Sequence, residues 1–239
     1  MTRFATLTLG EAPRTDLAPA FEAVAPQGTK VLHAGLLNGL DADEAARRFA
    51  PVGSESRFTT KFRSGAAVTV GRRAVVAGLR TRIRELEAEG AALILLLCND
   101  AFDELDDSYE ETGALQAAGK AARRAHLLQP GRLLPAVFAA LLNPKRVGVV
   151  VPRPELAIRP QEKWRIFAKT PLLAAAPPYS TTKEALADAA RQLVEAGAEA
   201  LVLDCMGYDE AQRRICAEAA GVPVLASRNV TADLVRMLL

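Results

Sequence analysis

The sequence predicts an α/β protein of two pseudo-symmetric lobes, each a parallel sheet flanked by helices. Two observations favour this architecture: short apolar runs alternate with longer amphipathic segments, and one helix–glycine–strand–cysteine pattern occurs twice. Strands that are separated by helices pair in parallel through right-handed crossovers. The chain has 239 residues, of which 50% are hydrophobic and 24% are charged, which is enough to bury such cores.

The first half of the chain is expected to contain four strands and one long helix. The strands are predicted at residues 4–9, 30–33, 66–70 and 92–97. The last of them, ALILLL, is continuously apolar, which is typical of a parallel strand that is covered on both faces. Segment 72–89 carries apolar residues at helical spacing, so it predicts an amphipathic helix that Gly90 ends.

The second half repeats this alternation of strands and helices. Strands are predicted at residues 125–129, 146–151, 200–203 and 222–225. Helices are predicted at residues 155–169, with a break at Pro160, and at 182–195, 209–220 and 231–239. Gly197 and Gly221 stand where the helices 182–195 and 209–220 should end.

A repeated pattern relates the two halves to each other. Cys98 follows Gly90 by eight positions in LEAEGAALILLLCND, and Cys205 follows Gly197 by eight positions in LVEAGAEALVLDCMG. Helix–glycine–strand similarity is common among βαβ units, but a cysteine at both strand ends is unusual because the chain has only three cysteines. We therefore expect residues 1–102 with 226–239 to form a first α/β lobe and residues 103–225 a second, with an active-site cleft between them.

The composition argues against several classes of protein. A net charge of +2 and an aromatic content of 5% offer little for binding nucleic acid or an anionic membrane surface. The longest apolar run, residues 133–142, is too short to span a membrane, and the first residues lack the pattern of a signal peptide. Three cysteines cannot all pair within one chain, so we expect free thiols and a cytoplasmic location.

No cofactor is expected. His33 and His126 have no second histidine at metal-ligand spacing, so a structural role is expected for both. The chain contains neither a G-x-G-x-x-G fingerprint nor a Walker-type loop, so nucleotide binding has no direct support. Cys216 lies inside a predicted helix beside apolar residues and is assigned to packing.

The two strand-end cysteines suggest a chemistry. Cys98 and Cys205 follow strands and precede helical segments, where the free N–H groups of a helix start favour thiolate and bind carboxylates. Two such sites facing one substrate provide a base, an acid and an anion clamp. This combination suits the removal of a proton from carbon on one face and its return on the other, through an enolate-like intermediate.

Several segments carry a resemblance that runs along nearly the whole chain. They are ATLTLGEAPR, ALILLLCNDA, VGVVVPRPEL, RPQEKW, LVLDCMGYDE and VPVLASRNV. On these segments the chain resembles the AroM family of the aspartate/glutamate and hydantoin racemase superfamily, which includes amino-acid racemases, maleate isomerases and arylmalonate decarboxylases. The resemblance implies a cofactor-independent enzyme in which Cys98 and Cys205 are the catalytic acid and base, and it is compatible with a homodimer.

The sequence departs from the racemase pattern after both cysteines. Asp100 stands where the racemases commonly have a threonine, two positions after the first cysteine. Met206 and Gly207 stand where they have a threonine followed by histidine or glutamate. These departures remove hydroxyl groups that usually bind the substrate carboxylate and a polar partner of the second thiol, so they argue against simple amino-acid racemisation.

Substrate binding is assigned to residues near the predicted strand ends. They are Gly10, Glu11, Arg14, Asn99, Asp100, Gln161, Met206 and Gly207. Gly10 permits close backbone approach, and Arg14 offers a bidentate fork to a carboxylate. The alternative for this first loop is a surface salt bridge beside an ordinary turn. Gln161 belongs to a second polar wall of the cleft or, alternatively, to a solvated helix start.

The predicted function is a racemase- or isomerase-type reaction on a small carboxylate, with proton transfer by Cys98 and Cys205. One alternative is a decarboxylase or lyase of the same superfamily. Another is a carboxylate-binding or regulatory protein without turnover, to which the missing polar partners point. A thiol redox protein is a further alternative, and it requires the two sulfur atoms to lie within bonding distance.

Overall fold

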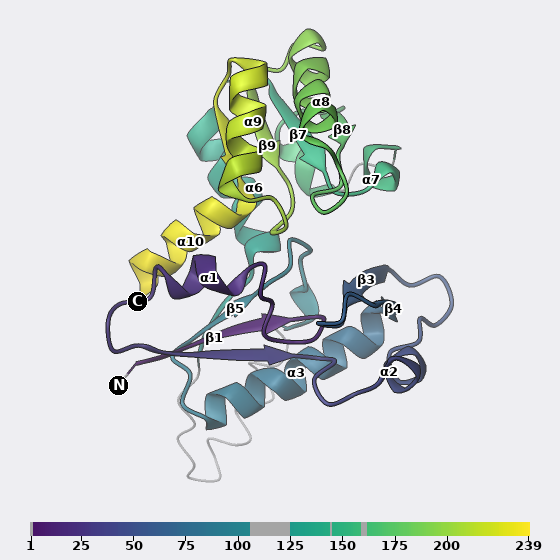
Figure 1. The fold of residues 1–239 in the computed structure, drawn as a ribbon, viewed down its shortest axis with the longest axis vertical. Helices are drawn as coiled ribbons and strands as arrows, with labels where there is room; N and C mark the ends of the chain where they lie inside the picture. Colours follow the sequence, from purple (N-terminus) through teal and green to yellow (C-terminus); the bar gives the residue numbers. More distant parts are fainter. Residues whose placement is uncertain (1, 106–124, 144, 159–161) are drawn as a thin grey trace. The chain divides into compact units, whose positions relative to one another are not determined.

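The computed structural model describes residues 2–105, 125–143, 145–158 and 162–239. The chain forms two compact units, Met1–Gln129 with Val235–Leu239, and Pro130–Leu234, which are called unit 1 and unit 2 below (Figure 1). The expected boundary after residue 102 differs from this division, because the strand near residue 127 pairs with the first sheet. No helix in the described ranges has the length and hydropathy needed to cross a lipid bilayer.

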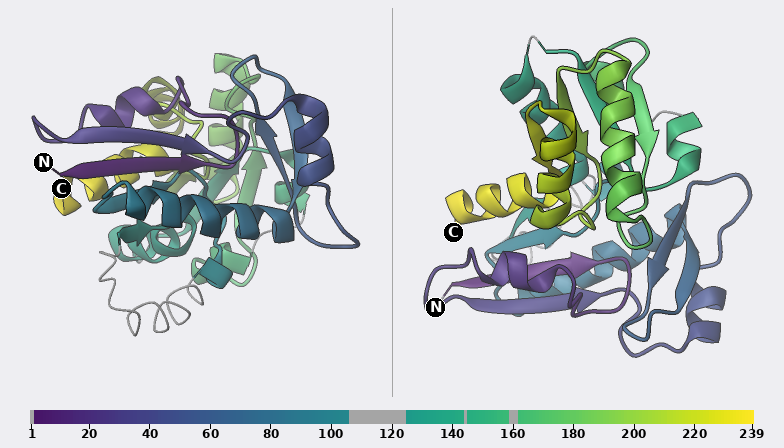
Figure 2. Two further views of the ribbon diagram at one scale, coloured as in Figure 1. Left: turned by 90° about the horizontal axis from the view of Figure 1, so that it is seen from below. Right: turned by 45° about the horizontal axis from the view of Figure 1, so that its top comes forward.

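Unit 1 is built on a four-stranded parallel sheet with the order β2-β1-β5-β6. Its strands are β1 (Arg3–Thr8), β2 (Lys30–Gly35), β5 (Leu93–Leu96) and β6 (His126–Leu128). Its helices are α1 (Ala18–Glu22), α2 (Ala42–Arg48) and α3 (Arg72–Ala88), with a 3₁₀ turn η1 (Asp103–Leu105). Helices α1 and α3 lie on opposite faces of this sheet (Figures 1 and 2), as parallel strands require.

The predicted strand 66–70 has a different partner from the one expected. It is β4 (Ala67–Gly71), and it pairs antiparallel with β3 (Arg57–Lys61) in a separate two-stranded hairpin. Strand β3 reads RFTTK, in which only Phe58 and Thr60 are buried, so its apolar signal was too weak to predict a strand.

Unit 2 is built on a second four-stranded parallel sheet with the order β10-β9-β7-β8. Its strands are β7 (Val147–Val151), β8 (Leu172–Ala175), β9 (Ala200–Leu203) and β10 (Val224–Ala226). Its helical segments are α6 (Pro130–Leu142), α7 (Pro154–Ile158), η2 (Glu162–Ile166), α8 (Lys183–Glu195), α9 (Glu210–Ala220) and α10 (Ser227–Leu238), of which α10 ends in unit 1. The single broken helix expected at 155–169 is therefore two short segments, and Pro160 lies outside the described residues.

The two sheets have the same topology and the same register. In each unit the first strand in sequence lies between the second and the third, and the fourth lies beyond the third. The Leu97 N–H donates to the Leu7 carbonyl at 2.8 Å, and the equivalent Asp204 N–H donates to the Val150 carbonyl at 2.9 Å. The two halves are thus equivalent in backbone hydrogen bonding, one residue before each candidate cysteine.

The glycines of the repeat end equivalent helices in equivalent ways. Gly90 and Gly197 have φ angles of +83° and +95°, in the left-handed region that glycine adopts without strain. Arginine side chains lie against both: a Cβ on Gly90 would come within 3.8 Å of Arg3 Nη1, and one on Gly197 within 2.7 Å of Arg146 Nη1. The repeat therefore extends to an arginine at, or directly before, the start of the first strand of each unit.

Candidate functional site

The two cysteines of the repeat lie two residues beyond the ends of β5 and β9. Cys98 and Cys205 are both partly exposed, and each packs against the apolar core of its own unit. Cys216 is buried in α9, and burial raises the pKa of its thiol to about 12. All three are thiols and none forms a disulfide. The structure therefore distinguishes two partly exposed cysteines from one that is buried in a core.

The thiol of Cys205 receives a backbone hydrogen bond from its own loop. The Gly207 N–H donates to Cys205 Sγ at 3.3 Å. The carbonyls of Met206 and Gly207 in turn accept from Arg228, at 2.7 Å from Nε and 2.9 Å from Nη2. The side chain of Met206 is buried, so this residue, which was assigned to substrate binding, contributes its backbone rather than an exposed side chain to the loop.

Gly207 is fixed by packing as well as by hydrogen bonds. A Cβ on Gly207 would lie 2.7 Å from Pro178 Cγ and 2.8 Å from Tyr179 Oη, so no larger residue fits without movement of that loop. The next residue, Tyr208, is fully buried, and its hydroxyl donates to the Ala176 carbonyl at 2.6 Å. Burial, with Cys205 and Asp204 nearby, raises the pKa of Tyr208 well above its usual range, so this phenol stays protonated and structural.

Asp204, the residue before Cys205, carries a buried ion pair. Its carboxylate accepts from Lys163 Nζ at 2.9 and 3.0 Å and from Trp164 Nε1 at 2.9 Å. Its side chain is only 3% exposed and that of Lys163 is 15% exposed. Asp204 does not cap α9. That helix is capped by Asp209, whose side chain accepts from the Gln212 N–H while Gln212 reciprocates.

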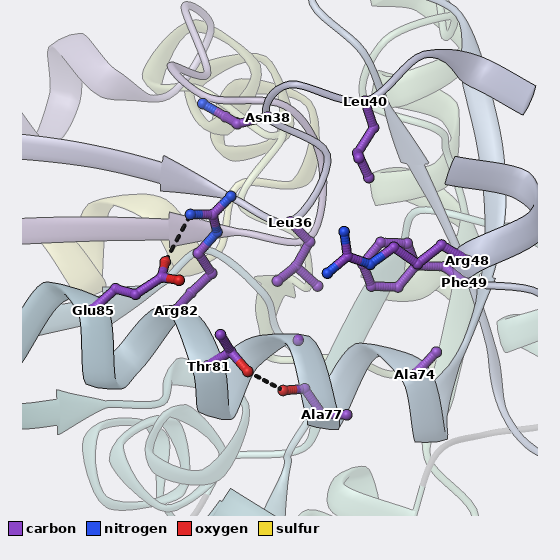
Figure 3. Close-up of a pocket in the computed structure, with 11 residues that line it drawn as sticks. Leu36, Asn38, Leu40, Arg48, Phe49, Ala74, Ala77, Thr81, Arg82 and Glu85 are labelled. Carbon is purple, nitrogen blue, oxygen red and sulfur yellow. Dashed lines mark hydrogen bonds and ion pairs between the residues drawn. The ribbon is translucent and has the colours of Figure 1, made fainter. Parts of the chain in front are cut away.

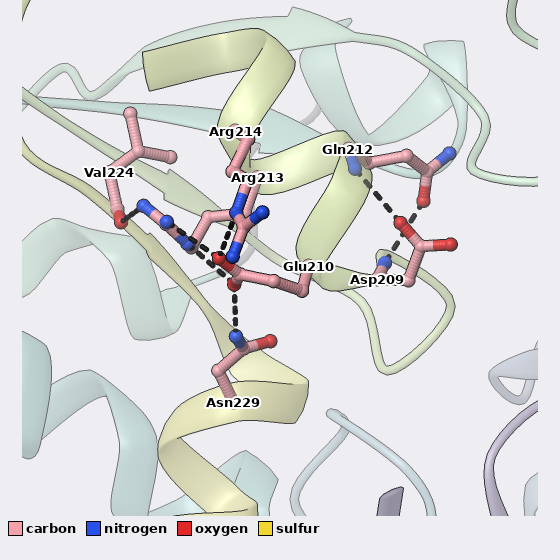
Figure 4. A network of polar contacts seen from close by, with 7 residues as sticks. All are labelled: Asp209, Glu210, Gln212, Arg213, Arg214, Val224 and Asn229. Atoms are coloured by element: carbon pink, nitrogen blue, oxygen red, sulfur yellow. Dashed lines mark hydrogen bonds and ion pairs between the residues drawn. The ribbon is translucent and has the colours of Figure 1, made fainter. Parts of the chain in front are cut away.

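A second polar cluster joins α9 to the start of α10 (Figure 4). Glu210 accepts from Arg213 at two 2.7 Å contacts, from Arg214 at 3.0 Å and from Asn229 Nδ2 at 2.5 Å. These donors, Arg213 first, hold the pKa of Glu210 down at about 2. Ser227, at the first position of α10, donates to the Leu203 carbonyl at 2.9 Å. Residues 227–229 therefore bind β9, the Cys205 loop and α9 in turn.

The environment of Cys98 is built differently. Its Sγ lies 4.0 Å from Asp100 Oδ2, at the outer limit of a hydrogen bond from sulfur. The residue following on the chain, Ala101, accepts from Arg72 Nη2 at 2.8 Å, and Arg72 also makes a bidentate pair with Glu104 at 2.7 Å. This pairing raises the pKa of Arg72 and lowers that of Glu104. The Cys98 loop is thus held by a cation at the start of α3.

Helix dipoles assist the two thiols less than the sequence suggested. The first helical segment described after Cys98 is the short 3₁₀ turn η1, which is too short to build an appreciable dipole. After Cys205, four residues precede α9, and the Asp209 carboxylate already caps that helix. The Cys205 sulfur accepts a hydrogen bond from a loop N–H, which sequence periodicity alone cannot reveal.

The loop after β1 uses its polar groups internally. Glu11 accepts from the Arg63 backbone N–H and from Arg63 Nε, both at 2.9 Å, and these bonds lower the pKa of Glu11. Arg14 makes a bidentate contact with Asp16 at 2.7 and 2.8 Å. Both side chains therefore form salt bridges, and their assignment to substrate binding stays a prediction. A Cβ on Gly10 would lie 2.5 Å from the backbone oxygen at the end of β3, so this glycine is required by packing against the hairpin.

The remaining predicted residues are less informative. Asn99 is partly exposed beside Cys98, and Gln161 lies outside the described residues. His33 is hydrogen-bonded at both ring nitrogens, to Thr6 and Glu22 at 2.8 Å, as expected for a structural histidine. Across the described ranges, no three His, Cys, Asp or Glu side chains come together in a way that fits a metal ion.

A cavity of about 310 Å³ lies in unit 1 between α3 and the segment after β2 (Figure 3). Its lining includes the apolar residues Leu36 and Phe49 and the arginines Arg48 and Arg82. Asn38 lines it and also accepts from the Ala12 N–H at 2.7 Å, which braces the loop after β1. Neither accessible cysteine lines this cavity, so it is separate from the candidate catalytic groups.

Solved structures of several other proteins are similar to this fold over nearly the whole chain. A maleate cis-trans isomerase of Nocardia farcinica is 18% identical and has a TM-score of 0.57, with 100% of this chain and 92% of that chain covered. A Yersinia pestis protein ascribed to the Asp/Glu racemases is 11% identical, with a TM-score of 0.57 and coverage of 100% and 99%. An arylmalonate decarboxylase is 16% identical, with a TM-score of 0.52 and coverage of 99% and 91%. At such identities the likeness shows the fold alone.

The family follows from a match to the sequence itself. Among proteins with curated descriptions, none matches the chain in sequence. The family model described as AroM protein, in contrast, matches residues 4–239. This match covers nearly the whole sequence and includes both cysteine loops and the Ser227–Arg228–Asn229 segment. The chain therefore belongs to the AroM family, and its fold is similar to the folds of the solved isomerase, decarboxylase and Asp/Glu racemase-like structures.

Proposed function

We propose that the protein is a cofactor-independent enzyme that transfers a proton at a carbon atom next to a carboxylate group. The observation that supports this most directly is that Cys98 and Cys205 occupy equivalent positions in two equivalent sheets. Both thiols are partly exposed, whereas Cys216 is buried. The carboxyl ends of parallel strands are where open α/β sheets bind their ligands.

The unlike surroundings of the two thiols support distinct roles. At Cys205 the Gly207 N–H donates to sulfur, and a donor to the charged form favours thiolate. At Cys98 the Asp100 carboxylate lies 4.0 Å from sulfur, and a neighbouring negative charge favours the neutral thiol. Groups whose environments differ in this way are suited to act as base and acid in one reaction. We therefore assign Cys205 as the base and Cys98 as the acid.

The proposed reaction consists of two proton transfers and needs no co-reactant. The Cys205 thiolate forms an S–H bond as the substrate C–H bond breaks, and the electron pair moves into an enolate of the carboxylate. The Cys98 thiol then gives its proton to the opposite face of the same carbon and is left as thiolate. The enolate is the costly species, and backbone N–H groups of the two thiol loops are the donors available to stabilise it.

A decarboxylase is the second candidate, and one observation favours it. The Gly207 N–H donates to Cys205 Sγ, whereas the Asp100 carboxylate lies near Cys98 Sγ, so the two thiols have different surroundings. Loss of carbon dioxide from a malonate-type acid leaves a carbanion that needs a single proton from one thiol. An arylmalonate decarboxylase is among the structures that share the fold.

The experiment is a proton-exchange screen. The protein is incubated in D₂O with hydroxy acids, amino acids, maleate and aryl malonates, and NMR with chiral analysis follows exchange, inversion and loss of carbon dioxide. Turnover that disappears in Cys205→Ala but persists in the buried-cysteine control Cys216→Ala supports the proposal. Carboxylate binding without exchange, inversion or decarboxylation would instead identify a binding protein and contradict it.

A further inference from the structure

The first turn of α10 contacts the Cys205 loop through the side chain of Arg228. Arg228 Nε donates to the Met206 carbonyl at 2.7 Å, and Arg228 Nη2 donates to the Gly207 carbonyl at 2.9 Å. Arg228 is partly buried, and both acceptors belong to the loop that begins at Cys205. A guanidinium offers several donors in a fixed planar fork, so it can hold two carbonyls in one relative orientation.

The geometry of one peptide bond connects this arginine to the thiol. In a planar trans peptide the carbonyl and the N–H point in opposite directions. The Met206 carbonyl and the Gly207 N–H belong to the same peptide: the carbonyl is bound by Arg228 and the N–H donates to Cys205 Sγ. Fixing the carbonyl on the arginine therefore aims the N–H at sulfur. A cation on the carbonyl side also polarises the peptide and strengthens the N–H as a donor.

We infer that Arg228 is a positioning residue, which stabilises the thiolate of Cys205 by orienting the Met206–Gly207 peptide. This inference rests on the proposed function, in which the Cys205 thiolate acts as the base. Arg228 acts through the peptide and is not itself placed in contact with a reacting atom.

The other charged and titratable groups near this loop do not perform the same task. Asp204 is compensated by Lys163, and Glu210 is compensated by arginines of its own helix. Tyr208 is held by the carbonyl of Ala176. Asn229, next to Arg228 on the same helix turn, binds Glu210 rather than the loop. Asn229 therefore provides a matched control on the same element.

The test measures the ionisation of Cys205 directly. In a Cys98→Ser background, the rate of alkylation by iodoacetamide is followed against pH, since Cys216 is buried. Arg228→Met should move the midpoint of that profile upward by about one pH unit, as expected when a donor to the charged form loses its support. Arg228→Lys, which keeps the charge but not the planar fork, should recover part of the shift. Asn229→Ala should leave the midpoint unchanged.

Two results would overturn the inference. One is an unchanged midpoint in a folded Arg228→Met protein, and the other is an equal shift in Asn229→Ala. Should Arg228→Met fail to fold, Arg228→Lys and Arg228→Gln provide the same comparison, with the amide NMR shift of Gly207 as a second readout; an unmoved amide would again contradict it.

The alkylation experiment tests the role of Arg228 independently of the turnover experiment that tests the proposed function. A shifted alkylation midpoint with no turnover on any carboxylate leaves Arg228 as a positioning residue and removes the proposed reaction. Turnover that requires Cys205, together with an alkylation midpoint that is the same in Arg228→Met, supports the proposed reaction and overturns the role of Arg228.

Discussion

The Cys98 and Cys205 loops occupy equivalent positions in equivalent sheets, yet they are held by different means. The Cys205 loop is held by Arg228 from a helix that follows it in sequence, and its sulfur accepts an N–H. The Cys98 loop is held by Arg72 from a helix that precedes it, and its sulfur lies near a carboxylate. The shared backbone register shows that the fold sets the positions of the thiols. The difference shows that the two thiols have different neighbours: a carboxylate near Cys98 and a backbone N–H at Cys205.

A second contrast lies one residue before each cysteine. Unit 2 has Asp204 there, buried with Lys163 and Trp164, whereas unit 1 has the apolar Leu97. A buried ion pair is weak evidence for stability, because desolvation offsets the attraction of the charges. Since the same position in unit 1 is occupied by leucine, the ion pair is not required to form the strand. It ties η2 to the end of β9, next to the Cys205 loop.

The largest expected effect separates the two thiols by reaction. Cys205→Ala should abolish both exchange and inversion, because it removes the base. Cys98→Ala should abolish inversion but retain exchange on the face that Cys205 serves. Loss of a general acid or base typically costs a factor of about 10²–10⁴ in rate. Chiral chromatography together with deuterium incorporation measures both quantities. Equal loss of exchange in both variants would remove the distinction between base and acid.

The next effect concerns stability and tests the contrast between Asp204 and Leu97. Lys163→Met should destabilise the protein by about 3–5 kcal/mol, because it leaves a buried carboxylate uncompensated. The double variant Lys163→Met/Asp204→Leu, which places the unit 1 residue in unit 2, should recover most of that loss. Denaturant unfolding measures both, with the exposed Lys169→Met as control. A double variant as unstable as the single one would show that the loss of stability does not come from the uncompensated charge of Asp204.

A smaller effect is expected in the Cys98 loop. Arg72→Met removes the bidentate contact to Glu104 and the bond to the Ala101 carbonyl, at a cost of about 1–3 kcal/mol. Amide hydrogen exchange of residues 98–105 should accelerate, while that of residues 205–209 should not. The neighbouring exposed Arg73→Met is the control. Acceleration confined to some other segment would show that Arg72 does not hold this loop.

The smallest effect is a pH dependence in unit 2. Because the folded pKa of Glu210 is about 2, below its usual value near 4.5, its ionised form contributes stability above pH 4.5 that is lost as the pH falls towards 2. Glu210→Gln should therefore flatten the decline of the melting temperature over that interval. Glu218→Gln, an exposed glutamate of the same helix, should not. An unaltered acid decline in Glu210→Gln would contradict the role assigned to the cluster in Figure 4.

The sequence predicted the repeat and the central strands because apolar runs ended by glycine and cysteine are local signals. It did not predict the hairpin of β3 and β4, since β3 is polar at four of its five positions. The ion pair of Glu11 with Arg63 was not predicted, because ion pairing between distant segments has no local signature. Arg228 was missed for a related reason: its acceptors are backbone carbonyls, which look the same in every sequence.

The most direct test of the central claim is a crystal structure of the protein soaked with small dicarboxylates and hydroxy acids. The account predicts one ligand carbon between the two sulfur atoms of Cys98 and Cys205, roughly 3–4 Å from each, as a near-attack geometry requires. A ligand that contacts only one of these sulfurs, or two sulfurs that open into unrelated crevices, would contradict it.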